Sequence, residues 1–136
     1  MSDVLSFIDY QKLTNRAIPT HDNQKDAILH WCIGLSEEVG ETLSVVKHHY
    51  YGGEDLSRED LVKEIGDILW YAAALCREAN INMEAVAKLN VQKLMHRFPG
   101  EEFDNNRSER RHELEQKFSD TEMYKELMEE ALGGIF

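Results

Sequence analysis

Residues 34–71 read GLSEEVGETLSVVKHHYYGGEDLSREDLVKEIGDILWY, and their pattern predicts two helices joined by a short turn. It carries two acidic clusters, one on each side of a glycine-containing break: Glu37, Glu38 and Glu41, then Glu64 and Asp67. Residues three or four apart share one face of a helix, so each cluster can present its carboxylates together. The break at residues 50–56 is short enough to fold two helices antiparallel. At about 1.5 Å of rise per residue, both clusters lie about 10–18 Å from the turn, and we expect them to be level.

The helical projection places these carboxylates beside the apolar stripe of each helix. With Leu35 at zero and about 100° per residue, Glu38 falls near 300° and Glu41 near 240°. Glu64 and Asp67 fall at about the same two angles when Leu61 is set to zero. Carboxylates on the shoulder of a core are costly unless they are paired or bind a ligand, and no Lys or Arg shares these shoulders. Oxygen ligands without sulfur or histidine favour Mg²⁺, with Mn²⁺ as a substitute. The alternative is a solvated acidic face.

The remaining pattern predicts an all-α fold, an antiparallel four-helix bundle. A first helix is expected within residues 2–17, before Pro19, and a second from an Asp22 cap to about His49. The second should bury a stripe that contains Cys32, Val39, Leu43 and Val46. The third begins at a Ser57–Asp60 capping pair, and the fourth runs from an Asn82 cap to about residue 98.

Composition divides the chain near residue 100. Residues 101–136 hold 11 acidic and 5 basic residues, a net charge of −6, against −11 for the whole chain. We expect a catalytic helical domain over residues 1–100 and an acidic, partly helical extension over residues 101–136. Ser119 and Glu122 predict a capping pair before a short helix at about residues 121–132.

Charge and hydropathy limit the function classes. The acidic net charge argues against binding a nucleic-acid polymer, which relies on phosphate neutralisation. No apolar run is long enough to span a membrane, and the N-terminus does not resemble a signal peptide, so we expect a cytoplasmic protein. Cys32 and Cys76 fall at apolar helical positions and are expected to be buried and reduced.

The fourth helix supplies basic residues. Asn90 falls in the middle of its apolar stripe, where an amide needs a partner. Lys93 and Arg97 lie on the helix surface next to this stripe. Basic groups aligned with a buried amide can hold phosphate oxygens. The alternative is that both side chains extend from a surface helix into solvent.

Three blocks in this order carry a resemblance to a known family. Glu37-Glu38-x-x-Glu41, a gap of 22 residues, and Glu64-x-x-Asp67 resemble the E-E-x-x-E … E-x-x-D signature of the MazG-like all-alpha nucleoside triphosphate pyrophosphohydrolases. The segment LNVQKLMHRFP resembles the N-x-x-K-x-x-x-R-[FY]-P ending of small members. The resemblance covers about residues 28–99.

The resemblance implies hydrolysis of nucleoside triphosphates, we expect deoxynucleoside triphosphates, to a monophosphate and pyrophosphate with Mg²⁺. It makes Glu38, Glu41, Glu64 and Asp67 metal ligands. Glu37 would orient or deprotonate the attacking water, and Asn90, Lys93 and Arg97 would hold phosphates. Trp31 and Tyr71 are candidates to contact the base or sugar, with a core or interface role as the alternative.

The resemblance also implies a homo-oligomer, a dimer or tetramer, for which Trp70 offers an exposed aromatic surface. Two other activities stay open within the superfamily: a dUTPase-like di- and triphosphatase, and a phosphoribosyl-ATP pyrophosphohydrolase. A non-enzymatic alternative is an acidic helical interaction module whose carboxylates only bind cations.

Overall fold

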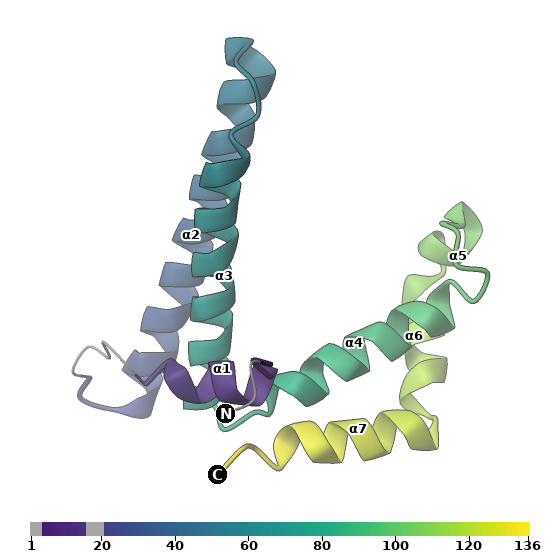
Figure 1. The fold of residues 1–136 in the computed structure, drawn as a ribbon. Helices are drawn as coiled ribbons and strands as arrows, with labels where there is room; N and C mark the ends of the chain where they lie inside the picture. Colours follow the sequence, from purple (N-terminus) through teal and green to yellow (C-terminus); the bar gives the residue numbers. More distant parts are fainter. Residues whose placement is uncertain (1–3, 16–20) are drawn as a thin grey trace. The chain divides into compact units, whose positions relative to one another are not determined.

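The computed structural model describes residues 4–15 and 21–136, and every regular element in these ranges is an α-helix (Figure 1). The helices are α1 (Phe7–Leu13), α2 (Gln24–Gly52), α3 (Arg58–Glu78), α4 (Met83–Arg97), α5 (Asn105–Glu109), α6 (Arg111–Ser119) and α7 (Glu122–Leu132). The all-helical class is confirmed, and the four-helix antiparallel bundle stays a prediction. The first helix is shorter than expected, and the stop expected at Pro19 lies outside the described residues.

The chain groups into two compact units. The first contains residues 9–79 and the second residues 80–136, so α4 groups with α5, α6 and α7. The functional boundary expected at residue 100 stays a prediction. None of the described helices combines the length and the apolar character needed to cross a membrane.

The first unit is built on the α2–α3 hairpin, whose two helices run side by side in opposite directions (Figure 1). Asn23, not Asp22, caps α2, because its side chain accepts a hydrogen bond from the Asp26 backbone N–H at 3.0 Å. The helix continues past His49 to Gly52, and its C-cap Gly53 has a φ of 69°, which glycine adopts without steric cost. The Ser57–Asp60 cap of α3 is confirmed by a 3.3 Å bond from the Asp60 N–H to Ser57 Oγ.

The helix faces that pack in this hairpin differ from the expected ones. The sequence predicts a buried stripe on α2, but Val39 and Leu43 are 52% and 66% exposed. Cys32 and Val46 on the same stripe are also exposed, and Cys76 is half-buried, so the prediction of two buried cysteines is wrong for Cys32. The hairpin instead closes at Gly34, where an added Cβ would lie 2.2 Å from the Tyr71 ring. A glycine permits this close approach, and it turns the carboxylate-bearing sides of the helices toward each other.

An apolar surface remains on α3 as well as on α2. Val62, Ile65 and Leu69 are exposed, whereas Trp70, expected to be exposed, is half-buried and lies edge-on to Tyr10 with ring centroids 6.2 Å apart. Trp70 is therefore not the free aromatic surface that the sequence suggested. The homo-oligomer stays a prediction.

The second unit packs α4 against α6 and α7 around Ala85, Leu114, Phe118 and Ala131. Asn82 caps α4, as predicted, and its N–H donates to Ala131 O at 2.8 Å, which joins the start of α4 to the end of α7. The extension is therefore helical and packed.

Thr121, not Ser119, caps α7, because α7 begins at Glu122, whereas Ser119 is the last residue of α6 and its hydroxyl donates to Gln116 O at 2.7 Å. The Thr121 side chain instead accepts a hydrogen bond from the Tyr124 N–H at 3.2 Å.

Candidate metal centre and phosphate-binding residues

Three of the predicted metal ligands come together on the hairpin. Glu38 of α2 and Glu64 and Asp67 of α3 each offer an oxygen, and these oxygens lie within 4.8 Å of one another. Glu38 and Glu64 are half-buried, and Asp67 is exposed. The antiparallel hairpin thus brings the two acidic clusters level, as the count from the turn predicts.

The carboxylates repel one another electrostatically. Burial raises the pKa of Glu38, and the neighbouring Asp67, Glu64 and Glu41 raise it further. The pKa of Tyr10 is also raised, by burial and by the charge of Asp67. Each shift reports that negative charge here is unfavourable without a positive partner.

No lysine or arginine in residues 4–15 and 21–136 forms an ion pair with these three carboxylates. The nearest lysine in sequence, Lys63, pairs with Glu59 at 3.0 Å and with Asp60 at 3.5 Å. A set of three carboxylates with no cation of their own fits a hard divalent ion, which favours oxygen ligands. The donor set therefore fits a metal ion.

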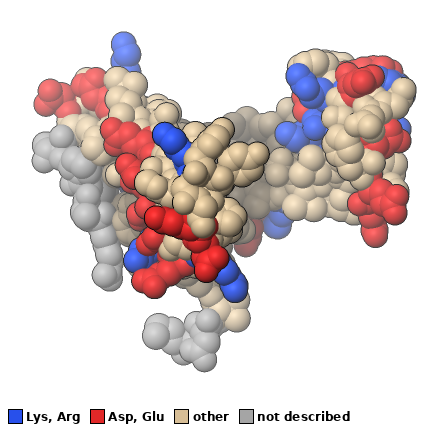
Figure 2. Space-filling model, turned by 90° about the horizontal axis from the view of Figure 1, so that it is seen from above, with Lys and Arg blue, Asp and Glu red and all other residues tan. Residues whose placement is uncertain are grey.

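The other two predicted acidic residues lie outside this group of three. Glu41 is exposed; it contributes to the raised pKa of Glu38 and, with Glu64, lines a pocket of about 390 Å³ toward the hairpin turn. His48 and His49 line the same pocket. Glu37 is exposed and does not belong to the group of three. Figure 2 shows acidic side chains gathered over this hairpin.

Trp31 and Tyr71 lie against each other, with ring centroids 6.0 Å apart. Trp31 is only 3% exposed, so it is a core residue of the first unit. Its buried Nε1 has no hydrogen-bond partner among the residues that the structure describes, and the rings of His21 and His30 pack edge-on around Trp31. The contact to a base or sugar stays a prediction.

Sequence reasoning missed Tyr10. Its hydroxyl donates to Gly66 O at 3.5 Å, and Asp67 affects its pKa. A tyrosine on a separate helix, 56 residues from its partner, has no local signal that would place it there. Its apolar neighbours in the first helix suggest only an amphipathic segment.

The prediction for Asn90 is wrong in one respect, because Asn90 is exposed and does not lie in a buried stripe. The face of α4 that packs contains Ala85, Leu89, Lys93 and His96, at spacings of three and four. Val91 and Met95, expected to be buried, are 52% and 58% exposed. The more polar face packs because α6 and α7 offer it ion pairs as well as apolar contacts.

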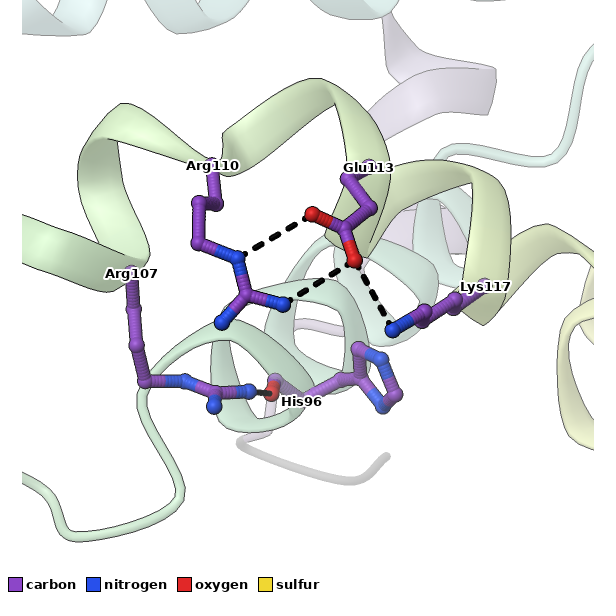
Figure 3. Close-up of polar contacts among 5 residues, drawn as sticks. All are labelled: His96, Arg107, Arg110, Glu113 and Lys117. Atoms are coloured by element: carbon purple, nitrogen blue, oxygen red, sulfur yellow. Dashed lines mark hydrogen bonds and ion pairs between the residues drawn. The ribbon is translucent and has the colours of Figure 1, made fainter.

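Lys93 and Arg97 both meet a carboxylate of the extension. Arg97 Nη2 forms an ion pair with Glu115 of α6, and Lys93 Nζ lies 4.0 Å from the same oxygen. Arg107 of α5 donates to the backbone carbonyl of His96 at 3.0 Å (Figure 3) and to that of Arg97. The basic residues of α4 are therefore held by the extension and do not extend freely into solvent.

Comparison with known proteins gives two findings and one negative result. Residues 28–101, more than half of the chain, match the MazG nucleotide pyrophosphohydrolase domain. The chain is 32% identical over 69 residues to the Gene 37 protein of Mycobacterium phage L5, a match that covers 48% of this chain and 60% of the phage protein. No solved structure matches the chain.

Proposed function

The chain belongs to the MazG nucleotide pyrophosphohydrolase family, and from this premise we propose that it hydrolyses nucleoside triphosphates, preferring deoxynucleotides, to a monophosphate and pyrophosphate with Mg²⁺. The observation that carries the proposal is the carboxylate group of Glu38, Glu64 and Asp67, which lies inside the family-matched segment. Mn²⁺ is the expected substitute, since it takes the same oxygen ligands.

The proposed reaction is hydrolysis of one phosphoanhydride bond. Water adds to the α-phosphorus, the bond from that phosphorus to the bridging oxygen breaks, and pyrophosphate leaves. Glu38, Glu64 and Asp67, together with Glu41, would hold the metal, and the exposed Glu37 would orient the water and accept its proton. A divalent ion held there supplies charge neutralisation for the phosphates and activates water.

The basic residues of α4 have a binding role in this proposal. Asn90, Lys93 and Arg97 bind substrate phosphates, and guanidinium and ammonium groups suit phosphate oxygens as charge-assisted donors. The exposure of Asn90 is compatible with a side chain that meets its partner only when substrate arrives.

A panel of nucleoside and deoxynucleoside triphosphates tests the proposal. With Mg²⁺ we expect pyrophosphate, and not orthophosphate, as the product, and no turnover with EDTA. The ranking of the panel separates a general pyrophosphohydrolase from a dUTPase-like or phosphoribosyl-ATP-specific enzyme. If wild type releases pyrophosphate no faster than the uncatalysed reaction, so that Glu38→Gln does not differ from it, the enzyme proposal is wrong, and the acidic interaction module stands in its place.

A further inference from the structure

The extension contacts the proposed phosphate-binding residues directly. Glu115, on α6, forms the ion pair with Arg97, and its Oε1 lies 4.0 Å from Lys93 Nζ. This carboxylate lies beyond residue 101, outside the family-matched segment. A carboxylate from outside the family-matched segment thus pairs with the two cations to which we assign phosphate binding.

We propose that Glu115 is an autoinhibitory carboxylate that competes with substrate phosphate for Lys93 and Arg97. The inference rests on the proposed function, because it takes these two residues as phosphate ligands. Carboxylate and phosphate oxygens accept the same charge-assisted bonds from a guanidinium. An N–H that donates to Glu115 is not available to a phosphate in the same direction.

The extension is fastened so that Glu115 stays at these cations. Arg107 donates one hydrogen bond to the carbonyl of His96 (Figure 3) and one to that of Arg97, the last carbonyls of α4, which the helix itself leaves unsatisfied. Phe118 follows Glu115 by three residues, and its ring centroid lies 5.6 Å from that of His96. Contacts on both sides of Glu115 therefore hold α6 against α4.

The exposure of the three side chains suits reversible competition. Arg97 is 15% exposed, whereas Glu115 and Lys93 are 39% and 38% exposed. An ion pair that solvent reaches is worth little, because water and salt screen it. A phosphate group with more than one negative charge can therefore displace Glu115, which a deeply buried pair would resist.

The control for this proposal lies on the same helix. Glu113 forms ion pairs with Arg110 at 3.0 Å and with Lys117 at 2.9 Å (Figure 3). Glu113→Gln therefore makes the same charge change on α6 as Glu115→Gln, without altering the partners of Lys93 or Arg97. Any effect of net charge alone appears in both variants.

The test is binding of inorganic pyrophosphate to the full chain, measured by isothermal titration calorimetry with EDTA, so that no metal at the carboxylates contributes. We expect Glu115→Gln to bind about three- to tenfold more tightly than wild type, and Glu113→Gln to bind like wild type. The gain should shrink as salt rises. Equal affinity of the two glutamine variants would overturn the proposal. Weaker binding by Glu115→Gln would also overturn it, since Glu115 would then orient Arg97 for phosphate.

An Arg97→Gln variant distinguishes failure of the phosphate assignment from failure of the autoinhibitory role alone. If it binds pyrophosphate as wild type does, the phosphate assignment fails, and the role of Glu115 fails with it. If it binds more weakly while Glu115→Gln gains nothing, only the autoinhibitory role fails. Circular dichroism establishes that each variant is folded, and Glu115→Ala, which lacks any polar group there, serves as a second removal of the carboxylate.

Discussion

In the α2–α3 hairpin, Glu38, Glu64 and Asp67 bring oxygens within 4.8 Å of one another, and the adjacent Lys63 pairs with other residues. In the second unit, by contrast, the cluster around Glu115 contains both signs, because Glu115 meets Lys93 and Arg97. Crowded like charges cost free energy unless a ligand neutralises them, whereas paired charges cost little. Within the described residues, the carboxylate group of the first unit therefore has no ion-pair partner, whereas Glu115 of the second unit has two.

The largest expected effect comes from removing a charge of the hairpin cluster. Asp67→Asn should lower turnover with Mg²⁺ by about a hundredfold or more, because a neutral amide is a poor ligand for a hard cation. Without metal, the thermal unfolding temperature should stay or rise, since one of the repelling charges is gone. Turnover and unfolding, each with Mg²⁺ and with EDTA, measure the two effects.

Glu59→Gln is the matched control for this change. Glu59 lies on the same helix and pairs with Lys63, so it leaves the cluster intact. Full activity in Asp67→Asn would remove Asp67 from the ligand set.

The second effect concerns the close approach that brings the cluster together. An added Cβ at Gly34 would lie 2.2–2.7 Å from three atoms of the Tyr71 ring, so Gly34→Ala must displace α3 or the ring. We expect a loss of about 1–3 kcal/mol in the free energy of unfolding, measured by urea denaturation. Gly40→Ala, in the same helix with nothing within 4 Å, should instead gain about 0.5–1 kcal/mol. Equal effects of the two alanines would show that the helices do not meet at Gly34.

The third effect concerns the proposed binding of substrate phosphate by Lys93 in the second unit. Lys93→Ala should raise KM about tenfold and leave kcat nearly unchanged, since the lysine is assigned to binding and not to chemistry. Lys88→Ala is the control, because Lys88 lies on the same helix and pairs with Glu84 and Glu130. A loss confined to kcat in Lys93→Ala would contradict the binding role.

Sequence reasoning succeeded where the signal is local. The Ser57 and Asn82 caps follow from residue types at fixed short spacings, and the level acidic clusters follow from counting residues back from one turn. It failed on which face of α2 packs, because a helical wheel favours the most apolar face. The actual contact is set by Gly34, whose lack of a side chain carries no weight on the wheel.

The same limit explains why the sequence predicted neither the exposure of Asn90 nor the ion pairs of Glu115. The packed face of α4 holds Lys93 because α6 supplies a carboxylate to it, and that partner lies 22 positions further along the chain. Composition alone describes residues 101–136 as acidic. It contains no information on which of their carboxylates meets a cation.

The smallest expected effect is a difference in pKa between one carboxylate of each unit, Glu113 and Glu38. Arg110 donates to both oxygens of Glu113, and Lys117 adds an ion pair, so the pKa of Glu113 falls from its ordinary 4.5 to about 2, whereas that of Glu38 is raised. A lowered folded-state pKa stabilises the fold above the ordinary value, and this contribution is lost as pH falls from 4.5 through about 2. NMR titration of the side-chain carboxyl carbons without metal measures both groups. Replacing Arg110 and Lys117 by Gln should return Glu113 toward 4.5 and leave Glu38 where it is. Two carboxylates that titrate together in the wild type would remove the contrast in charge between the units.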